Sequence, residues 1–148
     1  MNEVNQAQIF LPALALVGLT FIVLLLIPFQ RFKAALNGLV TKDDFKLGES
    51  DRVPEFVVIA NRSYMNLLEL PILFYFACTL SYLLEAVGIE VLVLAWGYAL
   101  LRFIHCAIHL SYNNVYHRLI AFGLSNIVLA GMWAFLLPPV IAAAKVTA

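Results

Sequence analysis

Four long apolar stretches constrain the fold of this chain more than any other feature. They span residues 9–29, 62–84, 91–110 and 119–140. The hydrocarbon core of a bilayer is about 30 Å thick, so a helix needs ~20 mainly apolar residues to cross it, and each stretch is about that long. Backbone polar groups inside lipid must be hydrogen-bonded, which favours helices. The sequence therefore predicts an all-α integral membrane protein with four transmembrane helices.

Composition and connections support a single transmembrane domain over residues 1–148. Apolar residues make up 64% of the chain and charged residues 12%, which is outside the range of soluble proteins. Short connections between consecutive helices favour an antiparallel four-helix bundle. The longest connection covers about residues 30–56, and Pro138 and Pro139 are expected to end the last helix. A formal net charge of zero argues against nucleic acid as a partner.

Basic residues near the ends of the four stretches predict the orientation in the membrane. The first connection contains five of them, namely Arg31, Lys33, Lys42, Lys46 and Arg52. The connection near residues 85–90 and the N-terminal segment contain none, and the C-terminal segment contains Lys145. Because basic loops stay in the cytoplasm, the 30–56 connection is expected there and both termini on the other side. A bacterial inner membrane and the endoplasmic reticulum both remain open.

Two stripes of polar residues lie inside the apolar stretches. The first consists of Arg62, Asn66 and Glu69, which fall within about 60° on a helix. The second consists of Arg102, His105, His109 and Tyr112, which fall within about 80°. An ionisable group facing hydrocarbon costs at least ~2.5 kcal/mol on insertion scales. Both stripes are therefore expected to point inward, toward each other or toward a wet cavity.

Counting from the non-cytoplasmic ends places the two stripes at the same depth. We expect Glu69 and Arg102 to interact, directly or through one bound group, since a lone buried charge is costly. Arg118 opens the fourth stretch and is either an interfacial anchor or a cation that closes the cavity. His105 and His109 provide two of the four ligands that a zinc site needs, so no metal is expected.

These residues together resemble the pattern of the MAPEG family, the membrane-associated proteins in eicosanoid and glutathione metabolism. The resemblance rests on Arg62, Asn66, Glu69 and Pro71, and on the run RFIHCAIHLSYNNVYHR with Arg102, His105 and Arg118. It covers about residues 9–140 and is most similar to the microsomal glutathione transferase and prostaglandin E synthase branches.

The resemblance implies a homotrimer of four-helix subunits that binds glutathione between neighbours near the cytoplasmic side. By this resemblance Arg62, Asn66, Glu69, Arg102 and His105 would hold the peptide. Arg31, with Lys33 as the alternative, would reach it from the adjacent subunit. Arg118 would stabilise the thiolate. The implied activity is a glutathione-dependent transferase or peroxidase acting on lipophilic electrophiles at the membrane.

Two positions depart from the family pattern, because His109 and Phe122 stand where the family has tyrosines. His109 can still donate a hydrogen bond to a thiolate, whereas Phe122 cannot. A non-catalytic member that binds lipid or a larger membrane complex is therefore the alternative. A proton or ion pathway is a third use of buried charge.

Overall fold

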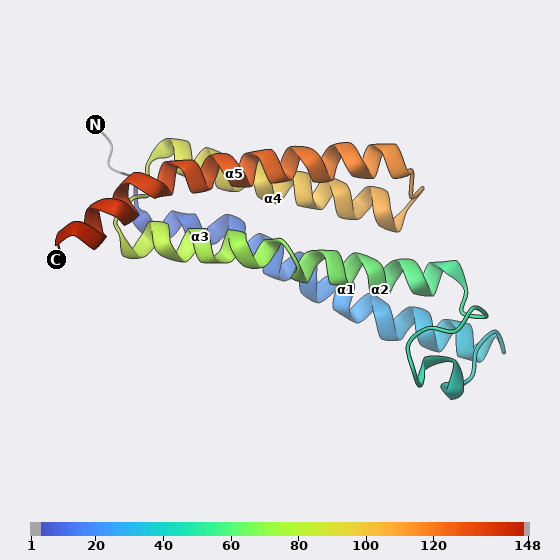
Figure 1. Ribbon diagram of the computed structural model, residues 1–148. Coiled ribbons are helices and arrows are strands. Elements are labelled where there is room, and N and C mark those ends of the chain that lie inside the picture. The colour runs from blue at the N-terminus through green and yellow to red at the C-terminus, as the bar shows by residue number, and fades with distance from the viewer. Residues whose placement is uncertain (1–3, 147–148) are drawn as a thin grey trace.

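The computed structural model describes residues 4–146 and shows a bundle of helices (Figure 1). The elements in chain order are η1 (Gln6–Ile9), α1 (Phe10–Leu36), η2 (Lys42–Phe45), α2 (Glu55–Leu68), α3 (Pro71–Leu83), α4 (Ile89–Leu110) and α5 (Val115–Val146). Four helical segments are long and apolar enough to cross a membrane: Gln6–Leu36, Glu55–Leu83, Ile89–Leu110 and Val115–Lys145. The all-α, four-span prediction is confirmed.

The four spans run antiparallel in two layers (Figure 1). The α4–α5 hairpin forms one layer, and α1 lies along α2 and α3 in the other. The largest hydrophobic cluster includes Ile9, Leu16, Phe74, Tyr98 and Met132, which are all fully buried. The two layers diverge toward the end that carries residues 37–54 and the α4–α5 turn, which we call the loop end. The buried residues Arg102, His105 and His109 of α4 lie in this diverging half, with Asn66 of α2 and Arg118 of α5.

The second span is broken near its middle, where α2 ends at Leu68 and α3 begins at Pro71. Proline lacks a backbone donor and is favoured at the first position of a helix. Pro71 accordingly occupies the first position of α3. The consequence of the break for the site is that the last carbonyls of α2 lack partners within their own helix.

Three helix boundaries differ from the sequence predictions. Helix α1 continues to Leu36 and α2 begins at Glu55, so the irregular connection covers residues 37–54 rather than 30–56. The expectation that Pro138 and Pro139 end the last helix was wrong, because α5 continues through both. A proline fits helical backbone angles, and membrane helices tolerate the lost hydrogen bonds better than soluble ones.

Helix α1 ends in a turn that requires glycine. Gly38 has φ +67°, and the amides of Gly38 and Leu39 donate to the carbonyls of Ala35 and Ala34 at 2.9 and 3.0 Å. This pair of bonds is the Schellman motif, which normally places glycine at the left-handed position. It reverses the chain and sends residues 40–45 back along α1.

We expect Gly38→Ala to lower the stability of the protein in detergent by about 1 kcal/mol, because an L residue is strained at positive φ. A Cβ added at Gly38 would have no atom within 4 Å, so the substitution tests backbone strain alone. Gly18→Ala is the matched control, since a Cβ there is also unobstructed and the helical backbone favours alanine. The unfolding temperature should fall for the first variant and rise slightly for the second; equal shifts would contradict the turn.

The connection between α1 and α2 is organised by a buried carboxylate, Asp44. Its carboxylate oxygens accept hydrogen bonds from the Ser50 hydroxyl at 2.7 Å, the Thr41 backbone amide at 2.8 Å and Arg52 Nη2 at 2.9 Å. The Ser50 hydrogen bond, followed by that of the Thr41 amide, holds the pKa of Asp44 well below its usual range. These bonds close the loop on itself over the end of α1.

This low pKa predicts acid sensitivity of the connection. A carboxyl with a lowered folded-state pKa stabilises the fold above its unfolded pKa of about 3.9, and loses that contribution as the pH falls further. The hydrogen-exchange protection factors of residues 40–52, which are corrected for the intrinsic pH dependence of amide exchange, should therefore fall progressively below about pH 4. Asp44→Asn should exchange quickly already at pH 7, whereas Asp43→Asn, at an exposed neighbour, should behave like the wild type. Protection factors in Asp44→Asn that equal those of the wild type at pH 7 would contradict this assignment.

Candidate functional site

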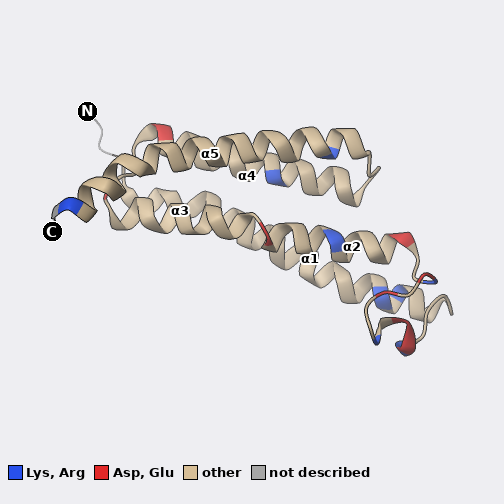
Figure 2. Cartoon of the chain, viewed as in Figure 1, with Lys and Arg blue, Asp and Glu red and all other residues tan. Residues whose placement is uncertain are grey.

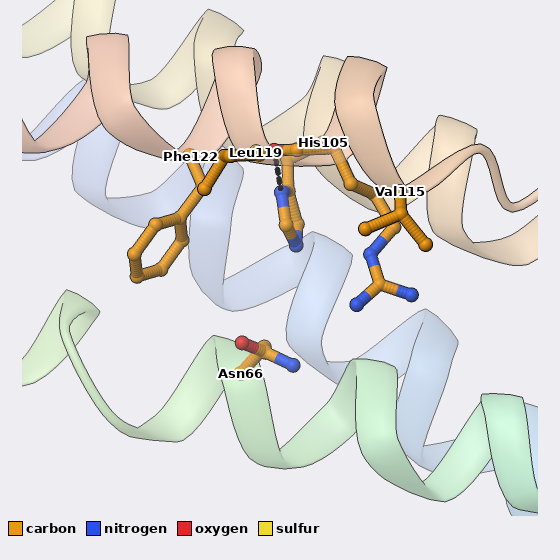
Figure 3. Close-up of a pocket in the computed structure, with 6 residues that line it drawn as sticks. Asn66, His105, Val115, Leu119 and Phe122 are labelled. Atoms are coloured by element: carbon orange, nitrogen blue, oxygen red, sulfur yellow. Dashed lines mark hydrogen bonds between the residues drawn. The ribbon is translucent and has the colours of Figure 1, made fainter.

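A polar cavity lies between α2, α4 and α5 in the diverging half of the bundle (Figure 3). Its volume is about 200 Å³, and its lining consists of Asn66, His105, Val115, Arg118, Leu119 and Phe122. Three of these were predicted from the sequence as site residues, namely Asn66, His105 and Arg118. The structure brings these three together from three different helices.

Helix α5 contributes the cation of the cavity, Arg118. One guanidinium nitrogen, Nη1, donates to Asn113 Oδ1 at 2.6 Å. Nε is buried and has no hydrogen-bond partner among residues 4–146. Arg118 is thus held in place from one side and keeps donor capacity for a ligand on the other.

Helix α4 contributes His105, which is 6% exposed. Its Nδ1 lies 3.1 Å from the backbone carbonyl of Arg118, the contact drawn in Figure 3. Because a carbonyl only accepts, Nδ1 carries the hydrogen of this bond. The other nitrogen, Nε2, is buried without a partner in the described part of the chain. The ring therefore ties α4 to the start of α5 and keeps a second nitrogen for binding.

Arg102 lies one helical turn deeper on α4 and is fully buried. Its Nη2 donates to the backbone carbonyl of Asn66, in the last turn of α2, where helix carbonyls lack internal partners. Nε and Nη1 are buried and unpartnered within residues 4–146. The guanidinium carbon lies 5.6 Å from the centroid of the Phe122 ring. Arg102 thus links the break in the second span to α4 and α5.

The expected direct contact between Glu69 and Arg102 is not formed. The ion pairs of residues 4–146 are Arg31 with Glu49 and Arg52 with Asp44. Arg102 is instead satisfied in part by the Asn66 carbonyl, which the break near Glu69 makes available. An interaction of Glu69 and Arg102 through one bound group stays a prediction.

The expected inward orientation is found for three residues of the second stripe and for Asn66 of the first, but not for Tyr112, Arg62 or Glu69. Arg102, His105 and His109 are buried, whereas Tyr112 lies beyond the end of α4 and is 60% exposed. Arg62 on α2 and Glu69 directly after its end are exposed, and Asn66 on α2 is half-buried. The buried side of α2 includes Ala60, Ser63 and Leu67, and Arg62 and Glu69 are turned by roughly 160–180° from Ala60.

Two further predicted site residues lie outside the cavity lining. His109 is 2% exposed, and its ring lies 6.0 Å from that of His105. Arg31 stacks on Phe45, with 4.6 Å from its guanidinium carbon to the ring centroid, and lies 3.7 Å from Glu49. Among residues 4–146, no group of three or more His, Cys, Asp or Glu side chains is placed to hold a metal ion.

Asn113, which positions Arg118, was not predicted as a site residue from the sequence. It lies in the α4–α5 turn with φ +49°, a conformation that asparagine tolerates better than most residues. Its side-chain oxygen accepts a hydrogen bond from the Arg118 guanidinium. The next residue, Asn114, caps α5, because its Oδ1 accepts a hydrogen bond from the backbone amide of His117 at 3.1 Å. The pair of asparagines in the run SYNNVYH could have indicated a turn followed by a helix N-cap, because asparagine is favoured at N-cap positions.

The fold and the site define an integral, multi-pass membrane protein with a cation-lined cavity inside its bundle. Comparison with protein-family models then shows a match to the MAPEG family over residues 9–137. The chain belongs to the MAPEG family, whose members have roles related to glutathione or eicosanoid metabolism in membranes. Comparisons with curated proteins and with solved structures found no match.

The burial of Arg102 without a carboxylate partner leads to a stability prediction. Desolvating a guanidinium costs several kcal/mol, whereas its hydrogen bond to a carbonyl contributes about 1–3 kcal/mol. Arg102→Met should therefore leave the ligand-free protein as stable as the wild type or more stable, by thermal unfolding in detergent. Arg52→Met is the matched control and should destabilise the protein, because it removes the partner of buried Asp44. A large loss of stability in Arg102→Met would show an unrecognised internal partner.

Proposed function

We propose that this protein is a membrane glutathione-dependent transferase or peroxidase that acts on lipophilic electrophiles. The observation that carries the proposal is the cavity where Arg118, His105 and Asn66 meet, in a chain of the MAPEG family. Glutathione carries carboxylates, amides and a thiol, which match a lining of guanidinium, imidazole and side-chain amide groups.

The unpartnered donors support binding of an anionic peptide. Arg118 Nε, Arg102 Nη1 and Arg102 Nε are buried without partners among residues 4–146, so each would gain a hydrogen bond from a bound carboxylate or carbonyl. Arg102 would then receive the negative charge that Glu69 does not supply directly. In this proposal Arg62 and Asn66 bind carboxylate and backbone groups, and Glu69 contacts the amino end.

A second subunit would complete this site. The cavity of about 200 Å³ is smaller than the roughly 300–1,000 Å³ of most small-molecule sites. Arg62 and Glu69 are exposed in one chain, as residues that bind a ligand between subunits would be. We propose a homotrimer in which Arg31 of a neighbour reaches the peptide.

The chemical role proposed for Arg118 is to favour the thiolate of glutathione. An ordinary cysteine thiol has a pKa near 8.5 and is mostly protonated at pH 7. A fixed positive charge beside the sulfur stabilises the thiolate, which is the nucleophile that attacks an electrophilic carbon. His109 would donate a second hydrogen bond. Phe122 in the cavity wall has no hydroxyl that could donate a hydrogen bond to the sulfur. Stabilisation of the thiolate therefore depends mainly on Arg118.

A glutathione titration of the purified protein in detergent tests the proposal. We expect glutathione to raise the unfolding temperature by mass action and to produce thiolate absorbance in the ultraviolet. Arg118→Ala should still bind glutathione, but the fraction of bound glutathione in the thiolate form at pH 7 should fall by about tenfold or more. Arg118→Lys should recover part of this fraction. Lys46→Gln, in the exposed loop, is the control and should match the wild type.

Three results separate the competing functions. No stabilisation at millimolar glutathione would contradict the proposed binding site. Normal binding and thiolate formation, without turnover of any lipophilic electrophile, would favour a non-catalytic member that binds lipid or a larger membrane complex. Equal thiolate in Arg118→Ala and wild type would contradict the role of Arg118.

A further inference from the structure

A second, mainly apolar cavity lies at the loop end, between the last turns of α1 and the segment that folds back along it. Its volume is about 460 Å³, within the roughly 300–1,000 Å³ typical of small-ligand sites. Phe32 and Ala35 of α1 and Phe45 of η2 line it, together with the cations Arg31 and Lys42. It shares no lining residue with the cavity that contains Arg118.

The position of this cavity is at the boundary between hydrocarbon and water. The first span contains 31 residues, so it is about 46 Å long at 1.5 Å per residue. That length exceeds the hydrocarbon core of about 30 Å and reaches the headgroup layers. Apolar side chains continue to this end of α1, where Phe32 is 71% and Leu36 is 88% exposed. Charged residues gather at the same end (Figure 2).

The charges of the cavity are of one sign. Its lining includes two cations and no carboxylate. Lys42 forms no ion pair within residues 4–146, and Arg31 Nε is buried without a hydrogen-bond partner there. The nearest acid to Arg31 is Glu49 at 3.7 Å, and Asp44 is occupied by Thr41, Ser50 and Arg52. An apolar hollow at the headgroup level, with Lys42 free of an ion pair and Arg31 Nε free of a hydrogen bond among residues 4–146, suits a molecule with an acyl chain and an anionic head.

We propose that this cavity binds an anionic phospholipid, with part of an acyl chain between Phe32 and Ala35 and the phosphate beside Lys42 and Arg31. Basic residues at the membrane surface attract anionic lipids, and a basic pocket adds specificity for the head group. The Asp44 hydrogen bonds to Thr41 and Ser50 fix the conformation of the connection, which contributes Val40, Thr41, Lys42 and Phe45 to one wall of the site. The lining of this lipid site includes Arg31, which the proposed function also assigns to a neighbour's glutathione site, but it shares no residue with the cavity that contains Arg118.

Native mass spectrometry of protein reconstituted with equal phosphatidylglycerol and phosphatidylcholine, then extracted in mild detergent, tests this proposal. We expect one retained phosphatidylglycerol per chain. Lys42→Glu should reduce its preference over phosphatidylcholine by about fivefold or more. Lys46→Glu is the matched control, because this exposed lysine lies on the same loop and outside the lining, and should keep the preference. Arg31 is left unchanged because it also belongs to the proposed glutathione site.

Ala35→Trp tests the cavity without changing charge. The indole would fill the hollow, so retention of either lipid should be lost while glutathione-dependent stabilisation remains. Equal losses in Lys42→Glu and Lys46→Glu, full retention in Ala35→Trp, or displacement of the lipid by inorganic phosphate would each overturn the proposal. A change of oligomeric state in Ala35→Trp would also overturn it, since a second copy would then be the occupant.

Discussion

The hydrogen bond from buried Arg102 to the carbonyl of Asn66 is the interaction on which the site depends. It is available because Pro71 interrupts the second span and leaves the final carbonyls of α2 without helical partners. A guanidinium at this depth needs such compensation, and its remaining nitrogens stay unpartnered within residues 4–146. Arg102 therefore joins the two layers but has no negatively charged partner among residues 4–146. A bound anion would supply that negative charge.

Around this interaction, each layer contributes a different property. The α4–α5 hairpin holds the cations and imidazoles, with Arg118 fixed by Asn113 and His105 fixed by the Arg118 carbonyl. Helix α2 contributes an amide and, on its exposed side, two charges. The large apolar cluster packs the opposite half of the bundle. The main hydrophobic core and the polar cavity thus lie at different positions along the length of the bundle, so the layers diverge at the loop end without disrupting that core.

Much of this arrangement was predictable from the sequence. Apolar length identified the four spans, and the spacing of Arg102, His105 and His109 placed them correctly on one buried face. The exposure of Arg62 and Glu69 was not predictable, because helical periodicity shows which residues share one side of a helix but not what that side contacts. The contact of Arg118 with Asn113 depends on the exact path of a turn. The extension of α1 to Leu36 continues beyond the hydrocarbon length on which span prediction is based.

The most direct test of the central claim is protection of position 66 by a glutathione analogue. In Asn66→Cys, a water-soluble maleimide should label the protein, and saturating S-methylglutathione should slow that labelling about tenfold, if the cavity is open to water and binds the peptide as proposed. Leu47→Cys, on the exposed loop, should be labelled at the same rate with and without the analogue. Labelling of Asn66→Cys that S-methylglutathione does not slow, or no labelling at all, would contradict a shared solvent-accessible site between α2, α4 and α5.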